Sequence, residues 1–272
     1  MEKQVPILVE PVELYSRIDD SNLRIIDISV SSEFRNSRIP GSFRIHPGEL
    51  YDGKKPTPGL VPSKERLQKL MSDLGLTHEL QIIAYDDEGG GHASRLVWTL
   101  YLLNHRRASV LNGGIQAWLA AGFPTIEKSV PTKRSKHLNF KLDDSVIADR
   151  EYIQERLGDP NLTLLDARTP EEYQGRKVMA KRGGHIPGAI NLNWLNSIDI
   201  QGDFRLKCKP ELDTMLSERN ITPTNEIVVY CQTHHRSAQS WMMLRHLGFP
   251  RVRGYPGSWS EWGNDLNTPV EL

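Results

Sequence analysis

The stretch Ile227-Val-Val-Tyr-Cys-Gln-Thr-His-His-Arg-Ser237 decides the fold, because three kinds of segment meet in it. Its first four residues, 227–230, are apolar and predict a buried strand, and a thiol and a cationic cluster follow at once. Beyond them, a tryptophan and two leucines at intervals of three predict a helix over residues 238–248, which ends on a glycine. The sequence therefore predicts a strand, a short cationic loop and a helix in succession.

The chain repeats itself over most of its length. Leu23-Arg-Ile-Ile-Asp27 matches Leu162-Thr-Leu-Leu-Asp166, and Ile39-Pro-Gly41 matches Ile186-Pro-Gly188. The same alignment puts Asp86 of the first copy at the position of Cys231 in the second. Because each copy contains several apolar runs that alternate with helical patterns, the repeat indicates a duplicated domain and not a solenoid.

The two copies differ in length at two places. The offset between matching residues is 139 before Tyr173 and 147 at Ile186, so the second copy carries eight extra residues between them. Beyond the loop that follows Tyr85, the offset falls from 145 to 144. We interpret this change as a loop that is one residue longer in the first copy.

The apolar runs of both copies lack clean alternation and are separated by helical patterns. Such runs indicate strands that are buried on both faces of a mostly parallel sheet flanked by helices, an α/β architecture. A chain of 272 residues is more than one hydrophobic core usually serves. A polar, charged stretch with a proline begins at Glu127 and is typical of a surface linker. We therefore predict domains over residues 1–126 and 143–272, joined by a linker over 127–142.

Composition excludes several classes of partner. Thirty-four basic and thirty-four acidic residues give a formal charge of zero, so the whole molecule offers no field for nucleic acid or an anionic membrane. No segment approaches the roughly eighteen apolar residues of a membrane span, and the N-terminus lacks a signal or transit pattern. Two cysteines, Cys208 and Cys231, make no disulfide framework and fit a reducing compartment. We expect a cytoplasmic protein.

The setting of Cys231 favours a reactive thiolate. Ligands of open α/β sheets bind where strands end and helices begin, and the first amides of a helix attract an anion. With Arg236 and two histidines beside it, the thiol should have a pKa below its usual value of about 8.5. Two other readings compete: a small buried hydrophobe, and a zinc ligand together with His234 and His235. The chain offers no second pair of metal ligands, so we expect no metal, and Cys208 has no comparable setting.

The residues that surround this thiol resemble those of the rhodanese superfamily, in particular its two-domain thiosulfate sulfurtransferases. The resemblance covers nearly the whole chain and rests on the Asp27 and Asp166 strands, the Ile-Pro-Gly turns, the CQTHHRS loop and Gly257-Ser-Trp-Ser-Glu-Trp262. It implies two tandem rhodanese-like domains, of which only the second is catalytic. The first copy agrees, because Asp86 replaces the cysteine and opens an acidic loop, DDEGGGH.

The resemblance also implies the reaction. Cys231 would attack the outer sulfur of thiosulfate, release sulfite and keep a persulfide, which passes its sulfur to cyanide or to a cellular thiol or protein. Covalent catalysis of this kind needs no cofactor. The loop that would hold the persulfide comprises Gln232, Thr233, His234, His235, Arg236 and Ser237.

An anionic donor needs fixed cations, and the insertion of the second copy supplies four of them: Arg176, Lys177, Lys181 and Arg182. We expect Arg182, and after it Arg176, to bind the donor. A solvated charged loop is the competing interpretation. Asp166, Arg168 and Glu172 are expected to form a structural ion pair at the strand end, and Trp259 and Trp262 to be core residues.

Three other functions remain open. A 3-mercaptopyruvate sulfurtransferase would carry an active loop that resembles C-G-S/T-G-V-T. A cysteine-dependent phosphatase or arsenate reductase would carry C-x5-R, whereas only four residues separate Cys231 from Arg236. A non-catalytic binding module would have lost the cysteine, which only the first copy has done.

Overall fold

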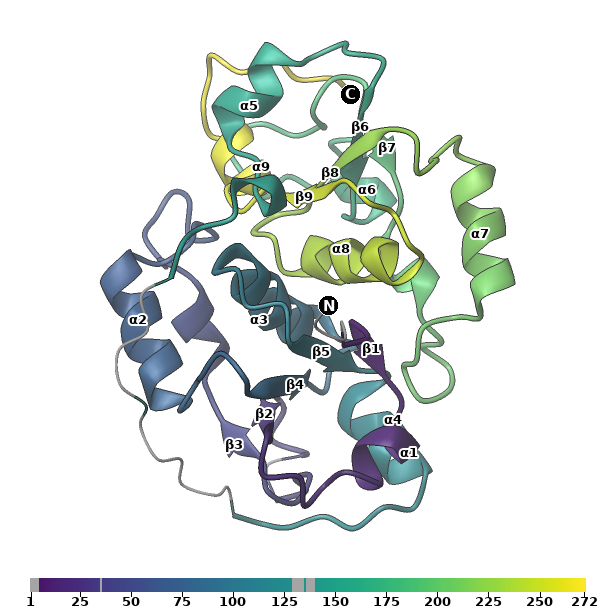
Figure 1. Ribbon diagram of the computed structural model, residues 1–272. Coiled ribbons are helices and arrows are strands. Elements are labelled where there is room, and N and C mark those ends of the chain that lie inside the picture. Colours follow the sequence, from purple (N-terminus) through teal and green to yellow (C-terminus); the bar gives the residue numbers. More distant parts are fainter. Residues whose placement is uncertain (1–4, 35, 129–134, 136–139) are drawn as a thin grey trace. The chain divides into compact units, whose positions relative to one another are not determined.

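The computed structural model describes residues 5–34, 36–128, 135 and 140–272 and divides into two compact units (Figure 1). Most of the predicted linker 127–142 lies outside the described residues. Each unit includes a short segment from the other half of the sequence. The first unit comprises Met1–Leu50, Pro62–Asp143 and Asp199–Leu206, and the second comprises Tyr51–Val61, Asp144–Ile198 and Lys207–Leu272.

The described part of the first unit contains a five-stranded sheet in the order β1-β5-β4-β2-β3, in which every pairing is parallel. Its strands are β1 (Leu8–Val9), β2 (Leu23–Asp27), β3 (Phe43–Arg44), β4 (Gln81–Tyr85) and β5 (Ala108–Leu111). Its helices are α1 (Pro11–Tyr15), the 3-10 turn η1 (Pro47–Leu50), α2 (Lys64–Asp73), α3 (Gly91–Leu102) and α4 (Gly114–Ala120).

The second unit repeats this plan with a four-stranded parallel sheet in the order β7-β6-β8-β9. Its strands are β6 (Leu162–Asp166), β7 (Ile190–Asn191), β8 (Glu226–Tyr230) and β9 (Val252–Gly254). Its helices are η2 (Asp144–Val146), α5 (Arg150–Glu155), α6 (Pro170–Tyr173), η3 (Trp194–Ser197), α7 (Lys209–Ser217), α8 (Arg236–His246) and α9 (Ser258–Trp262).

The central strand of each sheet has the burial that is typical of parallel sheets. All five residues of β4 are buried, as are the last four of β8, so both strands are covered on both faces. Because parallel neighbours need crossover connections, helices separate the strands along the chain. The predicted α/β fold with two tandem parallel sheets is confirmed, and none of the described helices is long and apolar enough to cross a membrane.

The matched tyrosines and Ile-Pro-Gly turns of the two copies form the same contact in each unit. The amide of Ile39 donates to the hydroxyl of Tyr85 at 3.2 Å, and the amide of Ile186 donates to the hydroxyl of Tyr230 at 3.2 Å. Each tyrosine lies at the end of the central strand and is fully buried. The tyrosine therefore fixes the turn beside the end of the sheet, which is where the loop of interest begins.

The tryptophans at the end of each copy are core residues, as the sequence predicted for Trp259 and Trp262. Trp118 and Trp262 are fully buried, and each indole N–H donates to a proline carbonyl that follows, Pro124 at 2.9 Å and Pro269 at 2.7 Å. Trp259 is also fully buried in the core of the second unit. The indole N–H of Trp259 donates to the carbonyl of Arg182 at 3.2 Å, so all three buried N–H groups are satisfied, as large buried indoles require.

The loops after the two central strands have the same length. Five residues separate Tyr85 from Gly91, the start of α3, and five separate Tyr230 from Arg236, the start of α8. The predicted longer loop in the first copy is therefore wrong. The extra residue lies after the helix start, because α3 has 12 residues and α8 has 11. The residues that match between the copies lie in the strand and at the later tryptophan, and they do not show where between them the extra residue lies.

Candidate active site

Cys231 directly follows β8 and is buried, with 1% of its surface exposed. Its amide donates to the hydroxyl of Ser258 at 3.3 Å, and the amide of Trp259 donates to its carbonyl oxygen at 3.0 Å. Ser258 in turn donates to the carbonyl of Tyr255 at 2.7 Å. The start of α9 therefore holds the main chain of Cys231 on both sides, and the thiol position is fixed by the fold.

The loop turns into α8 through an unusual residue. His234 has a φ of 53°, in the left-handed region that disfavours residues with a side chain, and the equivalent Gly89 of the first copy has a φ of 80°. The His234 side chain is fully buried, and its Nδ1 lies 2.8 Å from the hydroxyl of Ser237. A tight turn thus brings the first residues of α8 back toward Cys231.

Several groups oppose the effect of burial on the Cys231 thiol. Burial raises its pKa, but the positive charge of Arg236 and hydrogen bonds from the Ser237 hydroxyl and from the Ser237 and Thr233 amides outweigh it. The pKa is therefore lowered from the usual value of a cysteine, in the direction expected from the sequence. Surroundings of this kind favour the thiolate form of a cysteine.

Arg236 is held by Glu172, the carboxylate that the sequence predicted to pair with Arg168. Its guanidinium donates two hydrogen bonds to Glu172, at 2.6 and 2.9 Å, and Glu172 is buried. Burial would raise the pKa of Glu172, but the hydrogen bonds and charge of Arg236 lower it to about 2. Glu172 therefore fixes the cation that acts on Cys231.

Asp166 and Arg168 form the expected structural ion pair without Glu172 as a hydrogen-bonding member. Arg168 Nε lies 3.0 Å from both Asp166 oxygens, and Nη2 donates to Asp166 at 2.6 Å and to the carbonyl of Gly184 at 2.7 Å. Both side chains are buried, and the guanidinium stacks 4.5 Å from the ring centroid of Trp259. Because the charged groups of this pair have hydrogen-bond partners, the pair stabilises the end of β6.

The other loop residues contact neighbouring segments of the second unit. The Gln232 side chain donates to the carbonyl of Met179 at 3.0 Å, which joins the insertion to the loop. The His235 ring lies 6.2 Å from that of Trp194. At Gly59, a Cβ atom would lie 2.7 Å from the carbonyl oxygen of Thr233, so only glycine permits this close approach of two main chains.

The structure places the two candidate donor-binding arginines differently. Arg182 donates to the carbonyl groups of Thr268 at 2.7 Å, Trp262 at 2.9 Å and Asp265. Arg176 has a side chain that is 65% exposed and lies 4.0 Å from Glu171. Arg182 thus anchors the C-terminal segment, whereas the Arg176 guanidinium is accessible to a solute.

In the first unit, the carboxylate of Asp86 occupies the place that corresponds to the Cys231 thiol. The Asp86 carboxylate accepts hydrogen bonds from the amides of Gly90 at 2.8 Å, Ala93 at 2.9 Å and Glu88 at 3.1 Å. Asp86 is fully buried. Two amides of the loop and one from the first turn of α3 therefore point at one group at the strand end, which in the first copy is a carboxylate.

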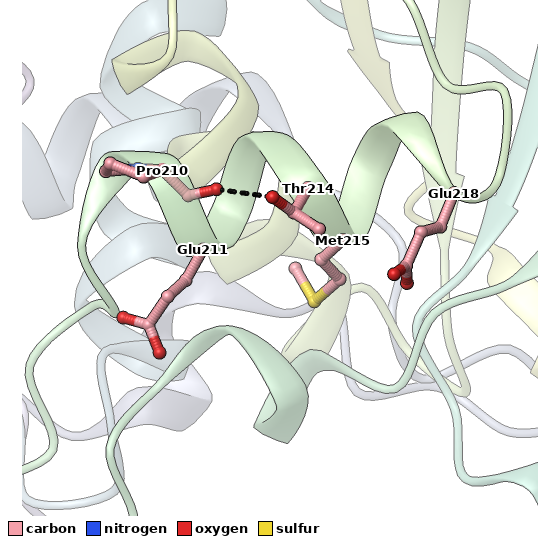
Figure 2. A pocket seen from close by; sticks show the side chains of 5 residues that line it. All are labelled: Pro210, Glu211, Thr214, Met215 and Glu218. Atoms are coloured by element: carbon pink, nitrogen blue, oxygen red, sulfur yellow. Dashed lines mark hydrogen bonds between the residues drawn. The ribbon is translucent and has the colours of Figure 1, made fainter.

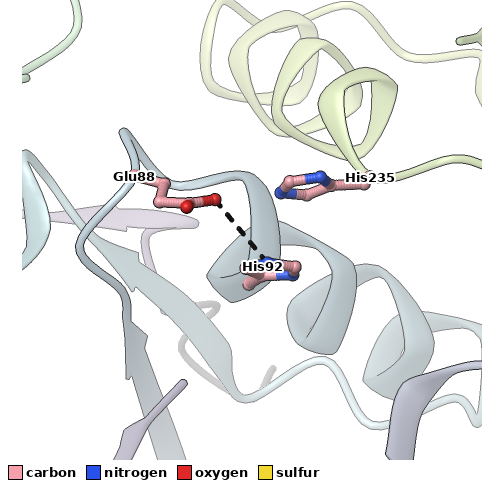
Figure 3. Close-up of side chains that lie close together, drawn as sticks. All are labelled: Glu88, His92 and His235. Carbon is pink, nitrogen blue, oxygen red and sulfur yellow. Dashed lines mark ion pairs between the residues drawn. The ribbon is translucent and has the colours of Figure 1, made fainter. Parts of the chain in front are cut away.

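The rest of the first loop is acidic. Glu88 lies 3.7 Å from His92 on the first turn of α3 (Figure 3). Burial, together with the charges of Asp86 and Asp87, raises the pKa of Glu88. This crowding of carboxylates distinguishes the first loop from the cationic loop after β8.

A shallow pocket on α7 offers no comparable chemistry (Figure 2). It is lined by Pro210, Glu211, Thr214, Met215 and Glu218, which include two carboxylates and no cation. Cys208 lies at the N-terminus of the same helix, where its exposed thiol donates to Glu211 at 2.9 Å. Two carboxylates in the lining disfavour an anionic ligand, and Cys208 has the helix-capping role of an ordinary surface residue.

Comparison with known proteins identifies related sequences over the whole chain. The family model of the rhodanese-like domain matches residues 10–121 and 149–265. A thiosulfate sulfurtransferase of Azotobacter vinelandii is 41% identical over 268 residues, which is 98% of each chain. A thiosulfate sulfurtransferase of Pseudomonas aeruginosa is 40% identical over the same share of both chains.

Solved structures show the same fold. A 3-mercaptopyruvate sulfotransferase from Escherichia coli matches with a TM-score of 0.82 and 25% identity, over 94% of this chain and 99% of that one. An anaerobic ergothioneine biosynthesis enzyme from Chlorobium limicola matches with a TM-score of 0.89 and 22% identity, over 99% of this chain and 71% of that one. At this identity the second match concerns the fold alone.

Proposed function

Because the chain belongs to the rhodanese-like domain family and is a sulfurtransferase, we propose that it carries the outer sulfur of thiosulfate on Cys231. One observation carries this proposal: a buried thiol at the end of β8 has a pKa that Arg236, Ser237 and Thr233 lower despite its burial. Thiosulfate as the donor follows from the similarity to enzymes with that name in two bacteria.

The first half-reaction loads the enzyme. The Cys231 thiolate attacks the outer sulfur of thiosulfate, the bond between the two donor sulfurs breaks, and sulfite leaves with the electron pair. A persulfide with a negative terminal sulfur remains on Cys231. In the second half-reaction a nucleophile such as cyanide attacks that terminal sulfur, and Cys231 leaves as a thiolate.

The terminal sulfur of the persulfide needs hydrogen-bond donors, and the loop from Gln232 to Ser237 supplies them in this proposal. The first unit supports it, because a loop of equal length and the first turn of the helix after it direct three amides at the Asp86 carboxylate. The same fact supports a catalytically inactive first domain, proposed over residues 1–126, and a catalytic domain over 143–272. Preorganised amides of this kind stabilise charge without rearranging during the reaction.

Phosphatase chemistry is less well supported. The guanidinium of Arg236 forms both its charged hydrogen bonds with Glu172, whereas a phosphatase needs that fork for the substrate oxyanion. A 3-mercaptopyruvate donor is the second candidate, because the similar structure from Escherichia coli belongs to an enzyme of that name. The acceptor in the cell and a cytoplasmic location remain predictions.

Substitution of the two arginines should separate donor binding from structure. We expect Arg176→Ala to raise the KM for thiosulfate several-fold, about 1 kcal/mol of binding, with kcat unchanged. Arg182→Ala should lower the unfolding temperature as well, because three carbonyl groups lose their donor. Steady-state kinetics and thermal unfolding measure the two effects, and Lys181→Ala in the same insertion is the control. An unchanged KM in both variants would exclude both residues from donor binding.

The proposed function is tested by incubating the purified protein with thiosulfate and recording its intact mass. We expect the mass of one added sulfur atom, located on Cys231 by peptide analysis and removed by cyanide as thiocyanate. Parallel incubations with 3-mercaptopyruvate and an aryl phosphate compare the other donor classes. An unmodified protein after thiosulfate treatment would refute the proposal.

A further inference from the structure

We propose that His234 is a positioning residue for the second half-reaction, in which it aims the hydroxyl proton of Ser237 at the departing sulfur of Cys231. This inference rests on the function proposed above and assigns one step of it to a particular pair of side chains. Neither residue needs to touch the donor or the acceptor for this role.

The contact between the two residues is short and enclosed. His234 Nδ1 lies 2.8 Å from the Ser237 oxygen, and both residues are fully buried. Ser237 lies on the first turn of α8, and its hydroxyl is among the groups that lower the pKa of the Cys231 thiol. A line of polar groups therefore runs from the imidazole through one hydroxyl to the sulfur.

The single proton of the Ser237 hydroxyl fixes which group donates in each of these hydrogen bonds. A serine hydroxyl has one proton, so a hydroxyl that donates to sulfur can only accept from its other neighbour. Nδ1 of His234 must then carry a proton and donate to Ser237. Without that donor, the hydroxyl is free to turn toward other acceptors, such as the carbonyl groups at the start of the helix.

The main chain supports a specific use of the imidazole. At the equivalent position the first copy has Gly89, which adopts the left-handed conformation without strain, whereas the second copy places a histidine there. A glycine would satisfy the turn. The turn therefore does not require a histidine, and the Ser237 contact gives the imidazole a use that a glycine lacks.

The hydrogen bond from Ser237 accelerates only one of the two half-reactions, because negative charge develops on the Cys231 sulfur only during discharge. During loading, the Cys231 sulfur gives up its negative charge to the new bond, so a hydrogen bond from Ser237 stabilises the starting thiolate. During discharge, the bond between the two persulfide sulfurs breaks and its electron pair goes to the Cys231 sulfur. A donor aimed at that atom is then stronger in the transition state than in the ground state, which accelerates the step.

Four variants test the inference: Ser237→Ala, His234→Gly, the double variant and His234→Asn. Glycine retains the turn without a donor, and asparagine tolerates the left-handed conformation and offers an amide N–H. Each protein is loaded with thiosulfate at alkaline pH, freed of excess donor and mixed with cyanide in a rapid-quench experiment. The rate of thiocyanate formation in a single turnover reports discharge alone.

We expect Ser237→Ala and His234→Gly each to slow discharge about tenfold, the difference that a hydrogen bond to a charged group makes. The double variant should be no slower than Ser237→Ala, because His234 acts through Ser237, and His234→Asn should recover most of the rate. Loading at alkaline pH should be affected less than discharge in each variant. Wild-type discharge by His234→Gly, or additive losses in the double variant, would overturn the inference. A wild-type protein that never acquires sulfur would instead refute the proposed function, and the inference with it.

Discussion

Replacement of Cys231 by aspartate is expected to abolish sulfur transfer while the second unit remains folded. Asp86 occupies the equivalent place in the first unit, where its carboxylate accepts hydrogen bonds from three main-chain amides. An aspartate at 231 should be held by its own loop in the same way, close to the positive charge of Arg236. Its carboxylate oxygens cannot carry a sulfur atom through the two displacements, so activity is lost without an empty cavity in the core.

Comparison with Cys231→Ala makes this prediction sharper. Alanine leaves the loop amides without an anion, and a buried donor without an acceptor costs about 1–3 kcal/mol. We therefore expect the aspartate variant to unfold at a higher urea concentration than the alanine variant, although neither forms thiocyanate. Cys208→Ser is the control, because that exposed thiol should be dispensable for activity. Thiocyanate production by Cys231→Asp, or a stability below that of Cys231→Ala, would contradict the parallel with Asp86.

The fold was predictable because its signals are local or repeated. The apolar run of β8 and the helical spacing after it are visible in one window, and the copy around Asp27 and Asp166 showed that the pattern occurs twice. Helix boundaries were less certain. The helix after the thiol begins at Arg236, two residues before the expected start. The loop tightens at His234, whose φ is left-handed, and no glycine at that position predicts such a turn from the sequence.

The candidate site was predictable only where its residues are neighbours in sequence. The thiol and its loop stand together, whereas the Arg236 partner Glu172 lies 64 positions earlier. Glu172 is close in sequence to Arg168, which made that pairing the natural expectation. The partners of Arg182 are main-chain carbonyls near the C-terminus, and carbonyl groups leave no trace in a sequence.

Arg236→Met is expected to destabilise the second unit strongly and to weaken the nucleophile. It leaves the Glu172 carboxylate, only 3% exposed, without its two hydrogen bonds. Removal of one partner from a buried ion pair costs about 3–5 kcal/mol, and we expect a loss of about 3 kcal/mol because Arg236 retains some exposure. The thiol also loses the cation that lowers its pKa, so loading by thiosulfate should fall at neutral pH and recover at alkaline pH.

The double variant Arg236→Met/Glu172→Met separates the two roles of the pair. It removes the unpaired carboxylate, so we expect most of the lost stability to return. The pKa of the Cys231 thiol should stay above its value in the original protein, so loading at neutral pH should stay slow. Urea unfolding and the pH dependence of loading measure these effects. A double variant that regains rapid loading at neutral pH would show that the charge of Arg236 does not lower the pKa of the thiol.

The ion pair also predicts how stability depends on pH. The pKa of Glu172 is lowered from 4.5 to about 2 on folding, so the folded state binds fewer protons than the unfolded state between these values. The stabilisation is therefore complete above about pH 4.5 and is lost as the pH falls toward 2. The double variant lacks this carboxylate, so its unfolding free energy should decrease less steeply across the same interval. Equal slopes in urea unfolding series of the two proteins would mean that Glu172 is not held as an ion by Arg236.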